Sequence, residues 1–395
     1  MCSPMIVCVL LPRFELAVAA GGRAALAQGP MALAPEPGRE QVVGEVSQAA
    51  EALGIHPGMR LGEALARAPR LALTPPDPVG VADAWERVLA RLEAVGAAVE
   101  SERPGSACFE ARGLRRLHGG SLDGTVDAVR AALRLPARIG AGPSRFCAVA
   151  AAGRARTRRA HIVRGAEDLA GEPVGLLRRR PQTAHLPAEL ERLGITTLGA
   201  LAALPRAAVA DRFGPAGILA HDLAHGRDTP LRPRAARETL EETLDLEESA
   251  SGEQLERALG LLIDRLLARP DRRGRVLRAA VLSARLVEGG TWRDRAVFRE
   301  PTADPLRMRL VLTQRLQLLP APAEALRLTA EQLGAAASGG PALFEEAAAR
   351  RAERLREAVR QARAAAGPDA ALRVLAIDPD SRVPERRAVL TPFEG

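Results

Sequence analysis

The sequence predicts an α+β chain of several domains, and three observations lead to this prediction. Strand-like and helix-like segments alternate through residues 5–156, short helices follow in residues 186–228, and a second α+β pattern occupies residues 238–328. A chain of 395 residues is long enough for roughly two to four domains with separate cores. The expected class is therefore α+β, with a helical module after a first mixed domain.

The first mixed domain begins with Met5–Leu11, which is rich in β-branched residues and is closed by Pro12, so it predicts a buried strand. Ala82–Val99 predicts a long amphipathic helix, because its apolar residues recur at helical spacing. The remaining segments expected in this domain are helices over Arg39–Leu53, Leu61–Ala68, Asp123–Leu133 and Phe146–Arg156, and strands over Cys108–Ala111 and Ala137–Gly142.

The helical module contains a tight turn at Leu193-Gly194-Ile195. Gly194 supplies the permissive backbone for such a turn, and Thr196 or Thr197 can cap the next helix. Backbone N–H groups at a helix N-terminus attract phosphate, so this hairpin is a candidate nucleic-acid contact. A hairpin that serves packing alone is the alternative interpretation.

The second α+β pattern reads strand, helix, strand, strand, helix, strand. Its expected strands are Glu238–Leu246, Arg275–Leu286, Thr291–Phe298 and Ala325–Leu328, and its expected helices are Gly252–Ala268 and Asp304–Leu318. Gly334–Gly340 predicts a flexible linker, Glu345–Ala366 a charged solvated helix, and Leu372–Phe393 an extended tail.

Composition is compatible with a phosphate-rich partner but does not decide for one. The net charge is +8 and the pI is near 10.8, and the chain carries arginine but no lysine. Tyr and Asn are absent as well, and a GC-rich genome is the alternative explanation for this usage. The four cysteines form no CxxC pair, which favours a reduced, cytoplasmic chain. The apolar run Met5–Leu11 is too short to span a membrane and lacks a basic segment before it, so we expect neither a signal peptide nor a membrane partner.

Four segments in the same order resemble the Y-family (translesion) DNA polymerases. Leu193–Leu204 resembles the family's thumb pattern LxxLGIxTLGxLAxL, and Arg212-Phe213-Gly214 and an A-G-x-D segment ending at Asp228 follow it. Gly54–Pro78 resembles the fingers signature. Ile139–Ala152 resembles the palm helix, with Ser144 and Arg145 where the family has Asn and Lys.

This resemblance implies a Y-family polymerase-like fold. It consists of a palm, helical fingers, a helix-hairpin-helix thumb and a βαββαβ little finger. The implied boundaries are residues 1–11 and 76–163 for the palm, 12–75 for the fingers, 164–232 for the thumb, 237–333 for the little finger, and 334–395 for a linker and C-terminal tail.

The catalytic positions of the family are altered. Leu10 stands at the first metal-binding aspartate, and Pro12 at the next acidic position. Gly105 and Ser106 stand at the second acidic pair, and Glu110 is the one acid that remains near the later position. Two-metal phosphoryl transfer needs carboxylates, so we expect no catalytic residue, no metal and no cofactor. Ordinary solvated surface is the expected environment of the other nearby acids, Glu15, Asp77, Glu100 and Glu102.

This degeneracy is similar to the ImuB type, a Y-family branch that works in DNA repair and SOS-induced mutagenesis. The resemblance implies a non-catalytic adaptor on damaged or primed DNA. Its implied partners are the sliding clamp, a separate error-prone polymerase and an ImuA-like or RecA-like protein. The tail Leu372–Pro392 resembles the segment that ends such proteins. The alternative is an active translesion polymerase that binds Mg²⁺ through displaced carboxylates.

Two groups of residues are candidate contacts. For DNA these are Gly194, Ile195, Thr196 and Thr197 in the thumb, and Arg278, Arg285, Arg293 and Arg295 in the little finger. Strand alternation places Arg293 and Arg295 on one face. For the sliding clamp they are Leu343 and Phe344, which match the end of a Q-L-x-L-F peptide although Gly340 replaces its glutamine. The alternative for this pair is a hydrophobic staple on the following helix.

Overall fold

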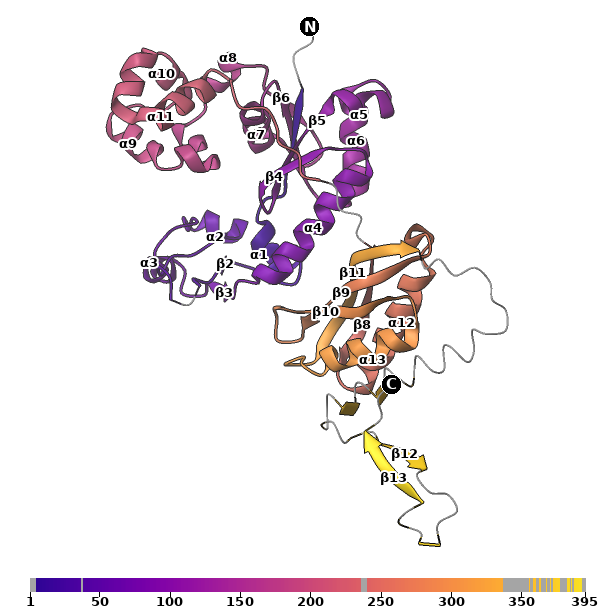
Figure 1. Ribbon diagram of the computed structural model, residues 1–395. Coiled ribbons are helices and arrows are strands. Elements are labelled where there is room, and N and C mark those ends of the chain that lie inside the picture. The colour runs from indigo at the N-terminus through magenta and orange to yellow at the C-terminus, as the bar shows by residue number, and fades with distance from the viewer. Residues whose placement is uncertain are drawn as a thin grey trace. The chain divides into compact units, whose positions relative to one another are not determined.

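The computed structural model describes residues 5–36, 38–235 and 240–336, and, further on, 355, 358–359, 362–363, 367, 370, 372–376, 382–383, 385 and 387–392. The chain divides into two compact units (Figure 1). The first contains residues 1–238 and 288–291, and the second contains residues 239–287 and 292–395.

A five-stranded sheet with the order β4-β5-β1-β6-β7 organises the first unit. Its strands are β1 (Ile6–Leu10), β4 (Val99–Arg103), β5 (Ser106–Glu110), β6 (Arg138–Gly142) and β7 (His161–Ile162). Val7 and Val9 face a core made with the helices α4 (Pro78–Ala94), α5 (Ala111–Leu117) and α6 (Leu122–Leu133). Ile6 and Cys8 face the opposite way, toward Ala148 and Ala152 of α7 (Arg145–Arg154). This alternation follows from the two-residue period of a strand that is buried on both faces.

A smaller core lies in residues 31–71, around the parallel pair β2 (Met31–Leu33) and β3 (Ala72–Thr74). The helices nearby are α1 (Phe14–Ala19), α2 (Gln48–Ala52) and α3 (Leu61–Arg67). The predicted helix Arg39–Leu53 is wrong in its first half, because only Gln48–Ala52 is helical. Gly44 lies against Leu33 with no room for a Cβ, and the Ser47 hydroxyl accepts from the N–H of Ala50 and starts the helix there.

The helical module of the first unit comprises α8 (Ala166–Leu169), α9 (Leu186–Arg192), α10 (Leu198–Ala202) and α11 (Arg206–Ala224), with 3₁₀ turns at Val174–Arg179 and Pro181–Thr183. Thr197 caps α10, as predicted, by accepting from the N–H of Ala200 at 3.2 Å. Gly214 interrupts α11 with φ 59° and ψ −147°, directly before Pro215, which cannot donate a helical hydrogen bond.

The second unit has the predicted βαββαβ order. Its elements are β8 (Leu240–Ala250), α12 (Glu253–Ala268), β9 (Arg275–Leu286), β10 (Thr291–Thr302), α13 (Pro305–Leu316) and β11 (Ala323–Ala336). The strands form a sheet with the order β10-β9-β11-β8, and both helices pack on one of its faces (Figure 1). We call the opposite face the helix-free face.

In the C-terminal region β12 (Leu372–Ala376) pairs antiparallel with β13 (Ala388–Pro392), within the segment predicted to be extended. The prediction of an α+β multidomain fold with a βαββαβ domain is therefore confirmed. The fingers-like region departs from the helical expectation, because it also contains the parallel pair β2–β3.

Candidate functional site

Leu10 ends the central strand of the five-stranded sheet, and its neighbours cannot replace a metal-binding aspartate. In register, Leu10 lies opposite Ser106 on β5 and Arg138 on β6. Its side chain packs at the edge of the small core under α7, together with Val149 and Leu231. The side chain of Leu10 is thus part of an apolar contact, whereas a hydrated cation at this position would need oxygen ligands.

Gly105 is required by the turn between β4 and β5. Its φ is +82°, and a Cβ there would lie 3.1 Å from the carbonyl oxygen of Leu11. The N–H of Leu11 donates to the carbonyl of Gly105 at 2.8 Å, which holds the turn against the end of β1. A side chain of any kind at this position is strained, so the backbone itself disfavours an acidic residue there.

The remaining side chains at this end of the sheet do not fit Mg²⁺. Hard divalent cations take carboxylate, carbonyl and water oxygens, whereas Leu10, Pro12 and Gly105 offer no side-chain ligand. Several arginines surround the position instead, namely Arg13, Arg23, Arg103, Arg138 and Arg179. Burial, and next the charge of Arg13, lower the pKa of Arg23. Within the described part of the chain, no three His, Cys, Asp or Glu side chains are arranged to hold a metal ion.

Glu110 lies at the other end of β5, opposite Ile6. It is four residues from Ser106, which corresponds to roughly 13 Å along a strand. Glu45, by contrast, accepts from the N–H of Leu16 at 3.0 Å, near the start of α1. Burial raises the pKa of the Glu45 carboxyl, so its surroundings disfavour the charged form.

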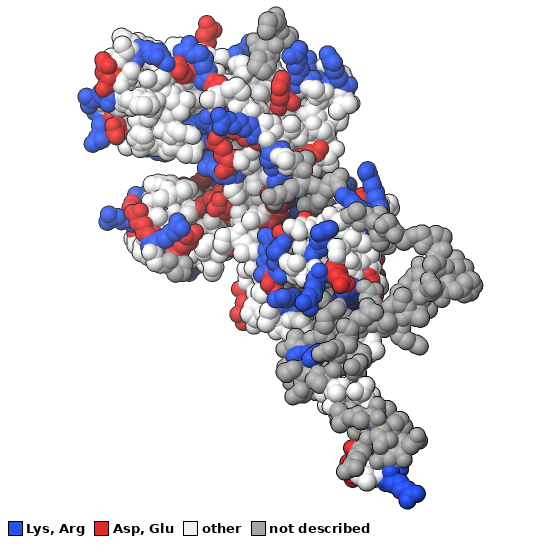
Figure 2. All heavy atoms as spheres, in the orientation of Figure 1, with Lys and Arg blue, Asp and Glu red and all other residues white. Residues whose placement is uncertain are grey.

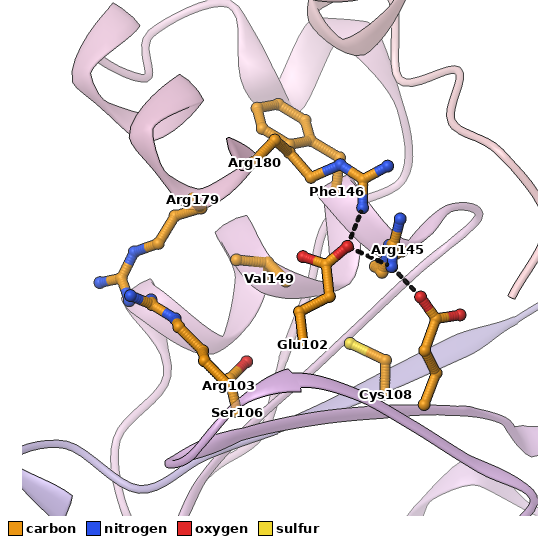
Figure 3. A pocket seen from close by; sticks show the side chains of 10 residues that line it. Glu102, Arg103, Ser106, Cys108, Arg145, Phe146, Val149, Arg179 and Arg180 are labelled. Carbon is orange, nitrogen blue, oxygen red and sulfur yellow. Dashed lines mark hydrogen bonds and ion pairs between the residues drawn. The ribbon is translucent and has the colours of Figure 1, made fainter. Parts of the chain in front are cut away.

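An ion-pair cluster fills the space beside α7 (Figure 3). We use this name for Arg145, Arg180, Glu100, Glu102 and Asp228. Arg145 bridges Glu100 and Glu102, and Arg180 donates to Glu102 at 2.8 Å and to Asp228 at 2.9 Å. Arg145 and Arg180 are only 8% and 6% exposed. Both arginines are therefore committed to internal carboxylates.

Asp228 fastens the cluster to two further backbone groups. It accepts from the N–H of Phe146 at 3.1 Å and from the N–H of Thr229 at 2.7 Å. Burial raises the pKa of Asp228, although Arg145 and these N–H groups act in the opposite direction. The N–H of Arg232 donates to Glu100, and Arg234 binds Glu86 and Glu93 of α4. The segment after α11 is thus tied back to the five-stranded sheet and its helix.

The cluster brings together residues that the sequence analysis treated separately. The expectation of ordinary solvated surface is wrong for Glu100, whose side chain is 14% exposed. It is also wrong for Asp77, which is buried and caps α4 by accepting from the N–H of Gly80 at 2.9 Å. Two signals were present in the sequence: Arg145 at the lysine of the palm helix pattern, and Asp228 at the end of the thumb pattern.

The thumb hairpin retains fewer free backbone donors than predicted. Gly194 has φ +79° and donates to the carbonyl of Glu191, and Ile195 donates to that of Leu190. Among the hydrogen bonds of the described residues, none uses the N–H of Thr196 or Thr197. The N–H groups of Thr196 and Thr197 are therefore the two that remain as candidate phosphate contacts in this hairpin.

The predicted arginines of the second unit lie on the helix-free face. Ala296 and Phe298 of β10 point into the core with the helices, so Arg293 and Arg295 share the other face, as alternation predicts. Arg278 and Arg285 of β9 are also exposed. Arg285 pairs with Glu324 at 3.2 Å and with Asp245 at 3.7 Å, and Arg295 pairs with Glu331. Figure 2 shows the same mixture of basic and acidic side chains over the visible surface of each unit.

Two further predictions concern the clamp-binding pair and membrane-spanning helices. Leu343 and Phe344 lie outside the described residues, so the clamp motif stays a prediction. As for membranes, no helix in the described ranges has both the length and the apolar character needed to cross a bilayer.

Parts of the chain are similar to known proteins. Residues 10–153 match the model of the impB/mucB/samB family. DNA polymerase IV of Caulobacter vibrioides is 26% identical over 275 residues, which are 67% of this chain and 68% of that protein. Protein ImuB of the same species is 32% identical over 185 residues, which are 44% of this chain and 38% of ImuB. A solved structure, DinB from Sulfolobus solfataricus, aligns with a TM-score of 0.49 at 14% identity, covering 83% of this chain and 99% of DinB.

Residues 10–153 therefore resemble the impB/mucB/samB family. The chain is similar to DNA polymerase IV over 67% of its length and to ImuB over 44%.

Proposed function

We propose that this chain is a non-catalytic Y-family polymerase homologue that binds damaged or primed DNA and acts as an adaptor in translesion synthesis. The observation that carries the proposal is the end of β1, where Leu10 packs under α7 between Ser106 and Arg138. A two-metal site needs several carboxylates at this place. The positive surroundings also oppose Mg²⁺.

The alternative, an active polymerase with displaced carboxylates, meets a specific obstacle in the ion-pair cluster. Glu100 and Glu102 line a pocket beside α7, together with Ser106 and Cys108. Arg145 pairs with both of these glutamates, and Arg180 pairs with Glu102. Glu110 lies at the far end of β5. Metal binding by Glu100 or Glu102 would thus break buried ion pairs. Glu45 and nearby Glu15 lie outside the cluster, but Glu45 already accepts from the N–H of Leu16, and burial raises its pKa and so disfavours its charged form.

The test is primer extension with Mg²⁺ or Mn²⁺, run beside a DNA-binding titration on the same preparation. We expect binding to primed DNA without nucleotide incorporation. The Leu10→Asp variant is also expected to be inactive, because the second acidic pair is missing. Template-dependent extension that is lost in Glu110→Ala or Glu15→Ala would contradict the proposal and establish the alternative.

The adaptor role is supported by the resemblance to ImuB and tested through the clamp peptide. Under the proposal, substituting Leu343 and Phe344 with Ala abolishes capture by the bacterial sliding clamp and leaves the melting temperature unchanged. The missing glutamine costs roughly 1 kcal/mol or somewhat more of hydrogen bonding, so the clamp affinity is expected to be modest. A lowered melting temperature with intact clamp capture would support the hydrophobic staple instead.

A further inference from the structure

Two arginines at the mouth of the pocket beside α7 are not used by the ion-pair cluster. Arg103 is the last residue of β4, and Arg179 ends the 3₁₀ turn Val174–Arg179. Both line the pocket that contains Ser106 and Cys108. In Figure 3 their side chains extend toward each other, away from Arg145 and Arg180.

No carboxylate in the described ranges forms a direct ion pair with either member of this pair. Within the described ranges, neither Arg103 nor Arg179 forms an ion pair with a carboxylate, and Glu102, the acid next to Arg103, is engaged by Arg145 and Arg180. Glu45 acts on both arginines through space, without an ion pair to either. Burial, and next the positive charge of Arg103, lower the pKa of Arg179. This direction agrees with the convergence of the two side chains in Figure 3.

The geometry suits a phosphate group. A guanidinium presents a planar fork of donors that matches phosphate oxygens, and two forks converging from different elements can hold one such group. Ser106 adds a hydroxyl on the same wall of the pocket. The cavity itself is only about 30 Å³, enough for a water or two, so a base or sugar has no room inside. The phosphate must sit at the mouth, with the remainder of its molecule in solvent.

We propose that Arg103 and Arg179 form a phosphate clamp at the end of the five-stranded sheet. The phosphate can come from the backbone of a nucleic-acid strand or from a free phosphate compound. The nucleic-acid source rests on the proposed DNA-binding function, whereas the phosphate chemistry does not. The phosphate clamp differs from the ion-pair cluster in its anion. The clamp binds the phosphate of another molecule, whereas the arginines of the cluster bind carboxylates of this chain.

The test compares two double variants that lose the same charge. Arg103→Gln with Arg179→Gln removes the clamp. Arg116→Gln with Arg178→Gln is the matched control, because Arg178 is the exposed neighbour of Arg179 and Arg116 is exposed on α5. Each protein is melted with and without inorganic phosphate, and each is titrated with a labelled single-stranded oligonucleotide at several salt concentrations.

Without ligand, the clamp variant is expected to melt at the same temperature as the wild type or higher, because a repulsion is removed. Inorganic phosphate is expected to raise the melting temperature of the wild type and the control more than that of the clamp variant. Oligonucleotide affinity is expected to fall about tenfold in the clamp variant, and the slope of log affinity against log salt by about 0.7, the value for one phosphate on a single strand, relative to the control.

The outcomes separate the two proposals. If wild type and control bind the oligonucleotide and the clamp variant binds equally well, with equal stabilisation by phosphate, the clamp is overturned and DNA binding survives. If no protein binds the oligonucleotide but phosphate still distinguishes the variants, the clamp stands with a free phosphate compound as its ligand, and the DNA-binding proposal fails. A clamp variant that melts lower without ligand shows that the arginines hold the fold, which also overturns the clamp.

Discussion

The ion-pair cluster and the helix-free face of the four-stranded sheet both gather arginines, but in opposite environments. In the cluster, Arg145 and Arg180 are buried and each binds two or more carboxylates. On the helix-free face, Arg285 and Arg295 are about half exposed, and their partners Glu324 and Glu331 are exposed as well. The number of arginines therefore says little about DNA contact in a chain that has no lysine. Burial and carboxylate partners decide which arginines remain available to a ligand.

The largest expected effect is on stability, from Arg145→Ala. Removing one partner of a buried ion pair leaves Glu100 uncompensated, which typically costs about 3–5 kcal/mol. Urea or thermal unfolding of the first unit measures this change. The matched variant is Arg285→Ala on the helix-free face, which we expect to change the stability by no more than about 0.5 kcal/mol, because its ion pairs are solvated. Equal losses in the two variants would remove the distinction between the regions.

The next effect is on DNA affinity, from Arg293→Ala with Arg295→Ala. If the helix-free face contacts phosphates, affinity for duplex DNA falls by about tenfold and the salt slope by about 1.8. The control is Arg257→Ala with Arg265→Ala on α12, which removes the same charge on the other side of the sheet. Binding that responds equally to both pairs reflects net charge alone, and unchanged binding in the first pair shows that this face does not contact DNA.

A smaller effect is expected from Thr197→Ala in the thumb hairpin. This variant tests whether the hairpin contacts DNA through its backbone or through the Thr197 side chain. Loss of the cap on α10 is expected to cost about 1 kcal/mol of stability. DNA affinity is expected to remain, because a contact through the N–H groups of Thr196 and Thr197 uses the backbone and not the hydroxyl. Thr196→Ala serves as the control, because the Thr196 hydroxyl caps no helix among the described hydrogen bonds. A large loss of affinity in Thr197→Ala alone would assign the contact to its side chain.

The smallest effect concerns Glu45, a partly buried carboxylate that binds a backbone N–H instead of an arginine. Burial raises its pKa, so the folded state holds the proton more tightly than the unfolded state does. Stability is then lost as the pH rises from the ordinary glutamate range through the raised value, and is regained on acidification. At neutral pH, Glu45→Gln is expected to melt slightly higher than the wild type, by less than about 3 °C. The difference vanishes at low pH, and a constant difference across the pH range would contradict this assignment.

The regular elements were predictable because local patterns determine them. The bounds of β9 agree with the predicted strand, and Thr197 caps the predicted helix, since hydrophobic period and capping chemistry act over a few residues. Gly194, Arg293 and Arg295 also lie on the turn and the face that their sequence neighbours predict.

The ion-pair cluster could not be predicted in the same way. Its members come from β4, α7, the junction between two 3₁₀ turns and the segment after α11, and Glu100 is separated from Asp228 by 128 positions. Alternation along β4 does not distinguish a solvated glutamate from one that faces α7, because β4 itself was not predicted. The strand Val99–Arg103 carries charged residues on an edge, which hides it from a search for apolar alternation.

The turn at Gly105 has a consequence for how this chain can change over time. An acidic residue at position 105 must adopt a backbone with φ near +82° and place a Cβ 3.1 Å from the carbonyl oxygen of Leu11. A single-codon change that places a carboxylate at position 105 therefore meets strain before any gain in metal affinity. Under the proposed non-catalytic function, a descendant of this chain that gained polymerase chemistry would have to rebuild this loop before an acidic side chain could be used there. The barrier at this position lies in the main chain, where a point mutation of the side chain alone does not remove it.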